Sequence, residues 1–308
     1  MSRPVLSIGN IAVGGRAKTP LAASVAARLR DMGERPAILS RGYGRRDAVD
    51  GVVVVRDPDG IRADLDRAGD EPLMLARQLD GVAVLVCADR HLAGRLAEHH
   101  FGCTVHVLDD GFQHFALRRD ADIVIVARDD VGGRTLPAGR LREPIDALAS
   151  ADAFVTLGDV DLPSEAGGRP ERNQPTWRAR RRQQPVRAAD PTSPAPDPAA
   201  GRILAVAGIA EPDGFFADLR AAGWTIARDL RFRDHHRYSR SDVDAIVSAA
   251  RDAGAGAIVT TEKDLVRLLP FRPFPLPVGF APLTLEIEAA ETFDAWLKAR
   301  VDAAREPS

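Results

Sequence analysis

Cysteine is scarce in this sequence of 308 residues, since only Cys87 and Cys103 are present. Two cysteines cannot build a disulfide framework, and their separation does not match the spacing of metal ligands. The scarcity therefore indicates a reducing compartment. Both cysteines lie in or beside apolar runs that resemble strands, so we expect buried, unreactive thiols.

The sequence also lacks any long hydrophobic run and any large excess of charge. No window of about 18 apolar residues exists, which argues against a membrane-spanning helix. The net charge is −2 and the pI is near 6.4, so no general basic field favours nucleic acid. The first strand begins within five residues of the N-terminus and leaves no room for a signal peptide. We therefore expect a cytoplasmic protein with no nucleic-acid partner and no transmembrane segment.

Short apolar runs alternate with helical patterns in the first half of the chain. The strand-like runs are 5–8, 36–39, 82–87, 104–108, 123–127 and 154–157, and the helical patterns are 21–32, 72–79 and 91–100. This rhythm predicts βαβ units, and hence an α/β fold with a mostly parallel sheet and helices on both faces. A further strand or hairpin arm is expected at 52–55.

The composition changes between residues 159 and 200, where Pro, Gly, Arg and Asp dominate. Such a change marks a boundary followed by a proline-rich surface loop. Regular patterning resumes at 203–207 and predicts a smaller α/β domain. Segments 177–186 and 278–287 are expected to pair as a two-stranded linker, before a final helix at 291–304.

The first apolar run leads into a pattern similar to a phosphate-binding loop. A turn with two adjacent glycines is followed by Lys18 and Thr19, which open an apolar-periodic helix. In such loops the backbone N–H groups and the helix N-terminus hold the phosphates, Lys neutralises them and Thr binds Mg²⁺. The usual pattern G-x-x-x-x-G-K-[ST] has glycines where this chain has Ala12 and Ala17. An ordinary strand–turn–helix crossing is therefore the alternative.

Polar loops follow several of the expected strands, which is where parallel α/β folds place their binding sites. The first loop, Ser-Arg-Gly-Tyr-Gly at 40–44, suits an anionic or sugar-like ligand, and a plain turn with a surface arginine is the alternative. The second, Gly-Asp-Glu-Pro at 69–72, begins a helix, where acidic residues can simply complement the helix dipole.

Two carboxylates, Asp109 and Asp110, end the apolar run 104–108. A strand that ends in Asp, together with a phosphate loop, is where phosphoryl-transfer enzymes hold Mg²⁺. A later loop at 136–144 adds Arg142, which can stabilise charge on a transferring phosphoryl group, and Glu143, which can join the metal shell.

The second half carries two further polar clusters. The adjacent histidines 235 and 236 would point in different directions on most backbones, and no third ligand is suitably spaced. A general acid/base or orienting histidine is therefore favoured over a metal site. The cluster Thr-Glu-Lys-Asp at 261–264 closes another strand, and the sequence indicates no role for it.

Taken in order, these clusters resemble the tetraacyldisaccharide 4′-kinase family, the lipid A 4′-kinases of Gram-negative bacteria. The matching stretches are Gly-Asn-x-x-x-Gly-Gly-x-x-Lys-Thr-Pro (9–20), Ser-Arg-Gly-Tyr-Gly (40–44), Gly-Asp-Glu-Pro (69–72), Asp-Asp-Gly-Phe-Gln-His (109–114), Leu-Pro-Ala-Gly-x-Leu-Arg-Glu-Pro (136–144), Asp-His (234–235) and Thr-Glu-Lys-Asp (261–264). Each stretch is weak by itself, but seven in one order over nearly the whole chain are highly specific.

The resemblance implies an ATP-dependent phosphotransferase with an alcohol acceptor. Its substrate would be the lipid A precursor tetraacyldisaccharide 1-phosphate, phosphorylated at the 4′-hydroxyl to give lipid IVA, and its cofactors would be ATP and Mg²⁺. It also implies two α/β domains joined by a two-stranded linker. The expected boundaries are 1–174 for a P-loop ATP-binding kinase domain, 175–200 and 273–288 for the linker and proline-rich loop, 201–272 for the smaller domain and 289–308 for the C-terminal helix.

The same resemblance implies the roles of individual residues. ATP would be bound by Gly14, Gly15, Arg16, Ala17, Lys18 and Thr19. Mg²⁺ would be held by Thr19, Asp109, Asp110 and Glu143. The catalytic residues would be Asp70 as the base for the sugar hydroxyl, His235 as its partner from the second domain, Arg142, Glu143 and Lys18. The disaccharide headgroup would be bound by Arg41, Tyr43, Arg90, Gln113 and His114.

The chain departs from the family pattern in two respects. Ala17 replaces a glycine, which costs about 1 kcal/mol if the residue needs positive φ, and Arg16 replaces a small residue and could add a phosphate contact. Many members also begin with a membrane-inserted segment, whereas this chain starts almost at its first strand. We therefore expect peripheral contact with the cytoplasmic face of the inner membrane. The arginines between 178 and 187 could attract anionic lipid there, or could form a solvated strand face.

Two other functions stay open at this point. One is a P-loop kinase or NTPase that acts on another sugar or small molecule. The other is a nucleotide-binding pseudokinase, which the presence of Lys18, Asp70, Asp109, Glu143 and His235 argues against. No protein partner is predicted.

Overall fold

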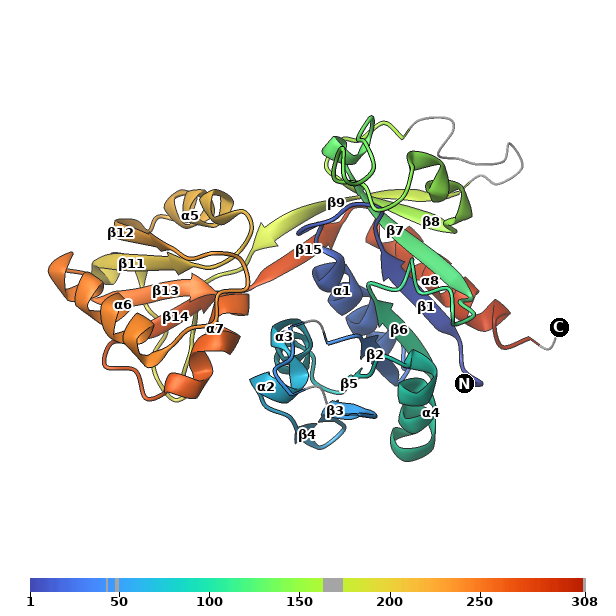
Figure 1. Cartoon of the computed structure of the whole chain (residues 1–308), viewed down its shortest axis with the longest axis horizontal. Coiled ribbons are helices and arrows are strands. Elements are labelled where there is room, and N and C mark those ends of the chain that lie inside the picture. The colour runs from blue at the N-terminus through green and yellow to red at the C-terminus, as the bar shows by residue number, and fades with distance from the viewer. Residues whose placement is uncertain (43, 48–49, 163–173, 307–308) are drawn as a thin grey trace. The chain divides into compact units, whose positions relative to one another are not determined.

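The computed structural model of the chain describes all residues except 43, 48–49, 163–173 and 307–308. It divides into two compact units (Figure 1). The first unit contains Met1–Arg181 and Leu285–Ser308, and the second contains Arg182–Thr284. Tyr43, which was expected to bind the headgroup, lies outside the described residues.

The larger sheet has ten strands in the order β15-β9-β8-β7-β1-β6-β2-β5-β3-β4. Their bounds are β1 Val5–Gly9, β2 Pro36–Ser40, β3 Val53–Asp57, β4 Gly60–Ile61, β5 Ala83–Val86, β6 Val105–Asp109, β7 Ala121–Ala127, β8 Ala153–Leu157, β9 Thr176–Gln183 and β15 Leu283–Ile287. The strands from β9 to β5 in this order pair in parallel, and β3 and β4 add an antiparallel edge. The predicted mostly parallel α/β sheet is thus confirmed.

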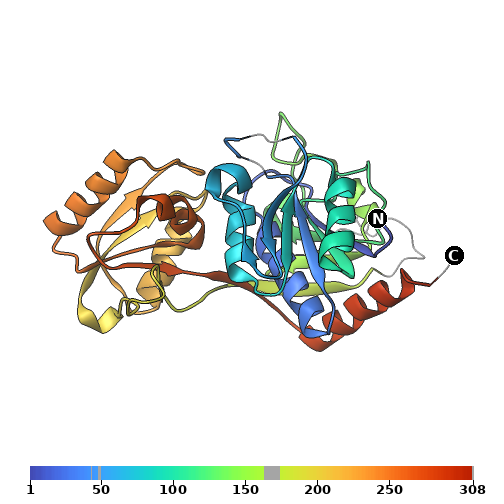
Figure 2. The same cartoon turned by 90° about the horizontal axis from the view of Figure 1, so that it is seen from below.

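Helices cover both faces of this sheet. They are α1 Lys18–Asp31, α2 Leu65–Ala68, α3 Asp70–Gln78, α4 Arg90–Phe101 and α8 Ala290–Ala303, with 3₁₀ turns at Arg128–Asp130 and Ile145–Ser150. Figure 2 shows α3 and α4 on opposite sides of the strands. The central strands are buried along their whole length because both faces are covered, which explains their continuous apolar runs.

The second unit is a smaller sheet in the order β10-β14-β13-β11-β12. Its strands are β10 Arg187–Ala188, β11 Arg202–Ala207, β12 Thr225–Arg231, β13 Ala257–Thr261 and β14 Val278–Ala281, and its helices are α5 Pro212–Ala221, α6 Arg240–Asp252 and α7 Glu262–Leu268. All neighbours pair in parallel except β10, which is antiparallel to β14. A second parallel sheet therefore brings another set of strand ends, and the loops after them, to one edge.

The chain passes between the units along β9 and β15, which are neighbours in the larger sheet. The expected pairing of 177–186 with 278–287 is formed only by the later part of the second segment. Its earlier part is β14, which pairs with β13 and β10 in the smaller sheet. Pro282 separates the two strands, and proline cannot donate a ladder hydrogen bond.

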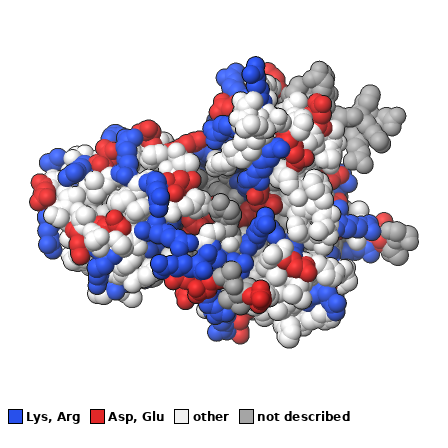
Figure 3. Space-filling model, viewed as in Figure 1, with Lys and Arg blue, Asp and Glu red and all other residues white. Residues whose placement is uncertain are grey.

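Both cysteines are 4% exposed, as expected for buried thiols, and burial raises the pKa of Cys103 to about 11. Among the described residues, no helix has the length and apolar character needed to cross a bilayer. Basic and acidic side chains are interspersed over the face shown in Figure 3, in keeping with the small net charge.

Candidate active site

The loop between β1 and α1 leads through a left-handed residue directly into the N-terminus of a helix. Ala17 is the N-cap residue of α1 and lies in the left-handed region, with φ 58° and ψ 28°. This is the conformation that a glycine adopts without strain, so the alanine occupies a position where glycine is the easier residue. Helix α1 begins immediately afterwards at Lys18. Its first N–H groups have no partner within the helix and can therefore bind an anion.

Arg16 anchors this loop through an ion pair with Asp130. Its guanidinium is 5% exposed, and Nη2 lies 2.8 Å from Oδ1 of Asp130, a fully buried carboxylate. Oδ2 of Asp130 accepts a hydrogen bond from the N–H of Ala127 at 2.8 Å, which fixes the carboxylate at the end of β7. The side chain of Arg16 is thus directed at Asp130, and this differs from the phosphate contact expected of it. The sequence offered no signal for the pairing, because 114 residues separate the two partners.

The loop 136–144 is joined to the phosphate loop through the backbone. The N–H of Val13 donates to the carbonyl of Arg140 at 2.8 Å, and the N–H of Arg142 donates to the carbonyl of Ile11 at 2.6 Å. The two clusters that the sequence placed more than 120 residues apart therefore form one surface. A third segment joins them, since Nη2 of Arg181 in β9 donates to the carbonyl of Gly15 at 2.7 Å.

Lys18 lies at the centre of a ring of polar side chains. Its Nζ donates to Oδ1 of Asn10 at 2.9 Å and lies 3.2 Å from Oδ1 of Asp110. Asp110 in turn contacts Nη1 of Arg142 at 3.1 Å. Gln113 closes the ring, because its Nε2 donates to the carbonyl of Asn10 at 2.9 Å and to Glu143 at 2.7 Å. Lys18, Asp110, Gln113, Arg142 and Glu143 were predicted site residues, and Asn10 was missed although it follows the strand directly.

The two cations determine the charge state of Asp110. Burial opposes ionisation of this carboxyl, but Lys18 and Arg142 outweigh burial and hold its pKa below the usual range. Asp110 is therefore a carboxylate that is already neutralised by neighbouring side chains. Its backbone is also in the left-handed region, with φ 59°.

Asp109, one residue earlier, has a very different environment. Its side chain is 4% exposed, and the hydroxyl of Thr19 lies 3.4 Å from each of its oxygens, which is long for a hydrogen bond. Burial raises the pKa of this carboxyl to about 7, and the carboxylates of Glu71 and Asp110 add to the effect. A buried carboxylate with so little compensation favours a bound cation beside it.

The residues around Asp109 fit a magnesium site of the kind found with nucleotides. No group of three or more His, Cys, Asp or Glu side chains in the described part of the chain is arranged as a metal cluster. Magnesium sites in phosphoryl-transfer enzymes need only one or two protein oxygens, because phosphates and water complete the octahedron. Asp109 and Thr19 supply such a pair.

Asp70 is the first residue of α3 and is 7% exposed. Its Oδ1 accepts a hydrogen bond from the N–H of Glu71 at 3.0 Å, which fixes the carboxylate at the helix N-terminus. The N-cap residue Gly69 has φ 86°, so the chain enters the helix through a turn that requires glycine. The Gly-Asp-Glu-Pro cluster therefore does more than provide helix-terminal charge: it holds one carboxylate in a fixed, buried position.

A second group of predicted residues forms a basic site on the same unit. Arg90 is 5% exposed at the start of α4, and its Nη1 donates to the carbonyl of Ala88 at 2.9 Å. Burial lowers the pKa of Arg90, and the nearby charge of Arg41 adds to the effect. Burial also lowers the pKa of His114, with Arg90 as the next cause. Within the described residues neither Arg41 nor Arg90 has a carboxylate within ion-pair distance, so this cluster suits an anionic ligand.

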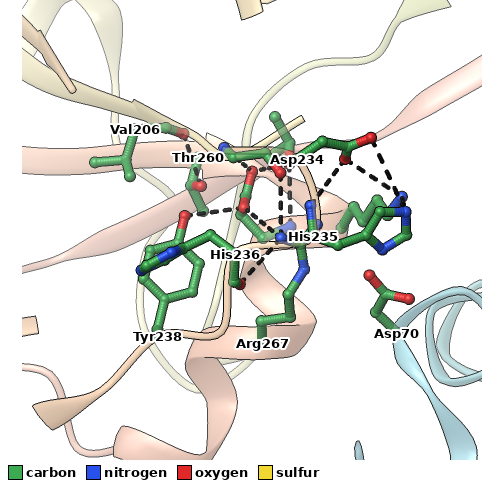
Figure 4. Close-up of polar contacts among 12 residues, drawn as sticks. Asp70, Val206, Asp234, His235, His236, Tyr238, Thr260 and Arg267 are labelled. Atoms are coloured by element: carbon green, nitrogen blue, oxygen red, sulfur yellow. Dashed lines mark hydrogen bonds and ion pairs between the residues drawn. The ribbon is translucent and has the colours of Figure 1, made fainter. Parts of the chain in front are cut away.

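The second unit holds His235, with a left-handed backbone at φ 56°. Its N–H donates to Oδ1 of Asp234 at 2.9 Å, and its Nε2 lies 3.1 Å from Nζ of Lys263 (Figure 4). The adjacent His236 has another environment, because its ring stacks on Phe232 at 4.6 Å and its Nε2 lies 3.3 Å from Asp242. The two imidazole rings thus have different partners, in keeping with the expectation that adjacent histidines point in different directions.

Comparison with known proteins agrees with this geometry. A model of the family described as Tetraacyldisaccharide-1-P 4'-kinase matches residues 1–302. The chain is 44% identical over 286 residues to the tetraacyldisaccharide 4'-kinase of Anaeromyxobacter dehalogenans, covering 87% of this chain and 73% of that protein. It is 40% identical over 271 residues to the enzyme of the same name from Koribacter versatilis, covering 86% and 79%.

A solved structure shares both the fold and the extent of the chain. It is a crystal structure of LpxK from Aquifex aeolicus in complex with ATP, with a TM-score of 0.79 and 28% identity, and it covers 98% of this chain and 89% of that one. The match over nearly all residues, at this identity to several relatives, confirms the resemblance that the seven motifs indicated. The chain belongs to the tetraacyldisaccharide 4′-kinase family.

Proposed function

We propose that the chain transfers the γ-phosphate of ATP to the 4′-hydroxyl of tetraacyldisaccharide 1-phosphate, giving lipid IVA. The observation that carries this proposal is the convergence of Lys18, Asp109 and the N-terminus of α1 at one edge of a parallel sheet. Phosphoryl transfer depends mainly on positioning and on charge neutralisation, and this edge supplies both. Family membership and the ATP in the Aquifex structure support the assignment of donor and acceptor.

Lys18 and the phosphate loop would bind the phosphates of ATP. Thr19 and Asp109 would hold Mg²⁺, which when bound neutralises charge on the phosphates. Asp110 is already paired with Lys18 and Arg142, so its role in this proposal is to orient these two cations. Glu143 accepts a hydrogen bond from Gln113 and would complete the polar wall on the side of the loop 136–144.

Asp70 would be the base that accepts the proton of the sugar hydroxyl. A buried carboxylate fixed by a backbone N–H keeps its geometry when the substrate arrives, which is what a general base needs. His235 of the second unit would be its partner. This partnership rests on the motif Asp-His at 234–235 alone.

The anionic headgroup of the acceptor would bind at Arg41, Arg90 and His114, with Gln113 beside them. A buried arginine without a carboxylate partner retains its full attraction for a phosphate. Tyr43 remains part of the proposal on the basis of the motif alone.

The acyl chains of such a substrate lie in a membrane, so we place the enzyme peripherally on the cytoplasmic face of the inner membrane. The arginines near residue 180 contribute less to this than their number suggests. Arg178 pairs with Asp159 and with Glu288, and Arg180 pairs with Glu288 at 3.0 Å. These pairs reduce the positive charge that the strand presents. We therefore favour a solvated strand face over a lipid-binding surface for most of this segment.

The test is γ-phosphate transfer from Mg-ATP to tetraacyldisaccharide 1-phosphate in detergent micelles. We expect transfer by the wild-type protein, and loss of most turnover in Asp70→Asn with ATP affinity retained, because Asp70 is assigned to the acceptor rather than to the nucleotide. Asp66→Asn, on the exposed side of α2, is the matched control.

Two results would contradict the proposal. ATP binding without transfer would point to another acceptor or to a pseudokinase. Normal turnover of Asp70→Asn at saturating substrate would show that Asp70 is not the base. A double variant with His235→Gln sharpens the assignment, since residues that act as a unit lose little more together than singly.

A further inference from the structure

The cluster Thr261–Asp264 has no part in the proposed chemistry, yet it contains a buried carboxylate with four polar partners. Asp264 is fully buried in the first turn of α7. Its Oδ1 accepts from the hydroxyl of Tyr238 at 2.9 Å, and its Oδ2 accepts from the N–H of Gly208 at 2.9 Å and from the hydroxyl of Thr261 at 2.6 Å. One carboxylate thus joins three segments of the unit.

Arg267, one turn later in α7, reaches the same segments. It is 4% exposed, and its Nη1 lies 3.4 Å from Asp264 and donates to the carbonyls of Gly208 at 3.1 Å and His236 at 3.2 Å. Asp264 and Arg267 therefore hold the loop between β12 and α6 at Tyr238 and at His236. His235 directly precedes the earlier of the two residues that they hold.

The loop needs such support because His235 is held in the left-handed region. For a residue with a side chain this conformation costs energy, and it persists only where the surroundings impose it. Lys263 supplies the contact at the imidazole itself, with Nζ 3.1 Å from Nε2 of His235 and 3.8 Å from Oδ1 of Asp234. Lys263 lies in the same turn of α7 as Asp264.

The composition makes this lysine conspicuous. The chain has 42 basic residues, and only Lys18, Lys263 and Lys298 are lysines. An ammonium group is a compact charge with three donors on a flexible stem, whereas a guanidinium is a planar fork. A lysine suits a single ring nitrogen better than the arginines that the chain uses elsewhere.

We propose that Lys263 is a positioning residue that fixes the orientation and the tautomer of His235. An ammonium group can only donate, so Nε2 must present its lone pair to Lys263, and the proton of the neutral ring then resides on Nδ1. Asp264 and Arg267 hold the backbone beneath it. The effect of Lys263 on catalysis rests on the proposed function, in which His235 is the partner of the base. The tautomer of His235 does not depend on that function.

The tautomer is tested on the full-length protein labelled with ¹⁵N-histidine, by long-range proton–nitrogen correlation at pH 8. The signal of His235 is assigned by its absence from His235→Gln. We expect an unprotonated Nε2 and a protonated Nδ1 in the wild type, and a mixture of tautomers in Lys263→Met. Lys298→Met is the control, because Lys298 is exposed on α8 and pairs with Asp302 at 2.7 Å; its spectrum should match the wild type.

The kinetic arm separates positioning from general structure. Lys263→Met should lower kcat at least tenfold and leave the KM for ATP unchanged, and Lys263→Arg should recover part of the loss. A wild-type ring protonated on Nε2, or an unchanged tautomer in Lys263→Met, would overturn the proposal. If the protein transfers no phosphate to the lipid, the proposed function fails while the spectrum still decides the role of Lys263.

Discussion

Each unit carries a buried aspartate at the carboxyl ends of the strands of its own parallel sheet. The two aspartates differ in the hydrogen bonds that they accept. Asp109 ends β6 of the first unit, and the hydroxyl of Thr19 lies 3.4 Å from each of its carboxylate oxygens. Asp264 follows β13 of the second unit and accepts three hydrogen bonds of 2.9 Å or less, with Arg267 beside it. Asp109 thus has one long contact to a hydroxyl, whereas Asp264 is saturated by protein donors.

This difference in hydrogen bonding distinguishes a carboxylate that stabilises the fold from one that is retained at a cost to stability. Burying a charge is costly unless it is paired and hydrogen-bonded, so a saturated carboxylate stabilises its surroundings while an uncompensated one is retained at a cost to stability. The raised pKa of Asp109 is the sign of that cost. Substitution at the two sites should therefore have opposite effects on activity and on stability.

The largest effect is expected for Asp109→Asn. Loss of the carboxylate that would hold Mg²⁺ should lower kcat/KM by about a thousandfold or more, which corresponds to about 4 kcal/mol of transition-state stabilisation. The fold should be unaffected or slightly more stable, because an uncompensated buried charge is removed. Steady-state kinetics and thermal unfolding in the absence of Mg²⁺ measure the two quantities. A clear loss of stability would place Asp109 with Asp264 as a supporting residue.

Asp264→Asn should instead lower the stability of the second unit. The amide cannot balance Arg267, so a buried cation loses its partner, and such losses cost about 3 kcal/mol or more. Hydrogen exchange of the amides in β11 and β13 should accelerate, while exchange in β1 and β6 of the first unit stays unchanged. Tyr238→Phe is the milder comparison, because it removes one hydroxyl donor and should cost about 1 kcal/mol. Equal exchange rates in Asp264→Asn and the wild type would refute the supporting role.

Protonation of Asp109 gives a pH test of the same contrast. Its carboxyl has a pKa of about 7 in the folded protein against 3.8 for an exposed aspartate, so between these values the folded state keeps a proton that the unfolded state has lost. Stability without metal should therefore fall as the pH rises from about 4 to about 7. Over the same range Mg²⁺ affinity should rise, because the metal requires the ionised form. Melting temperatures recorded with Mg²⁺ and with EDTA should diverge as the pH increases, and Asp109→Asn should abolish the divergence.

The sequence predicted the parallel sheet because its central strands are continuous apolar runs, and it predicted the site because the polar motifs follow those strands. Strand β12 was not predicted, since its arginines and aspartate interrupt the apolar pattern of an edge strand that is only partly buried. Asp130 was missed, and the motif that contains Lys263 was given no role, for another reason. Each acts through a contact to a residue distant in sequence, and no local pattern encodes such a contact.

Backbone conformation was also beyond the reach of residue patterns. Among the described residues, four other than glycine have positive φ: Ala17, Asp110, His235 and Ala289. Three of them are residues that the family resemblance assigned to the site. Strained backbone at these positions is typical of functional sites, where the surrounding structure imposes it.

The fourth residue offers a control for the smallest predicted effect. Ala17 and Ala289 are both alanine N-caps in the left-handed region, at α1 and at α8, and neither has a side-chain cap. Glycine at either position relieves about 1 kcal/mol of strain, and its greater freedom in the unfolded chain offsets part of that gain. Ala17→Gly and Ala289→Gly should thus raise the free energy of unfolding by similar, small amounts.

Only Ala17→Gly should alter nucleotide binding. The methyl group of Ala17 lies at the turn that would hold the phosphates, so its removal should tighten ATP binding by up to about fivefold, the equivalent of about 1 kcal/mol. Calorimetric titration of both variants with Mg-ATP measures the difference. Equal affinities would mean that the methyl group does not crowd the phosphates and that the alanine costs the loop only strain. Tighter binding in both variants would locate the effect in general stability, because α8 takes no part in the site.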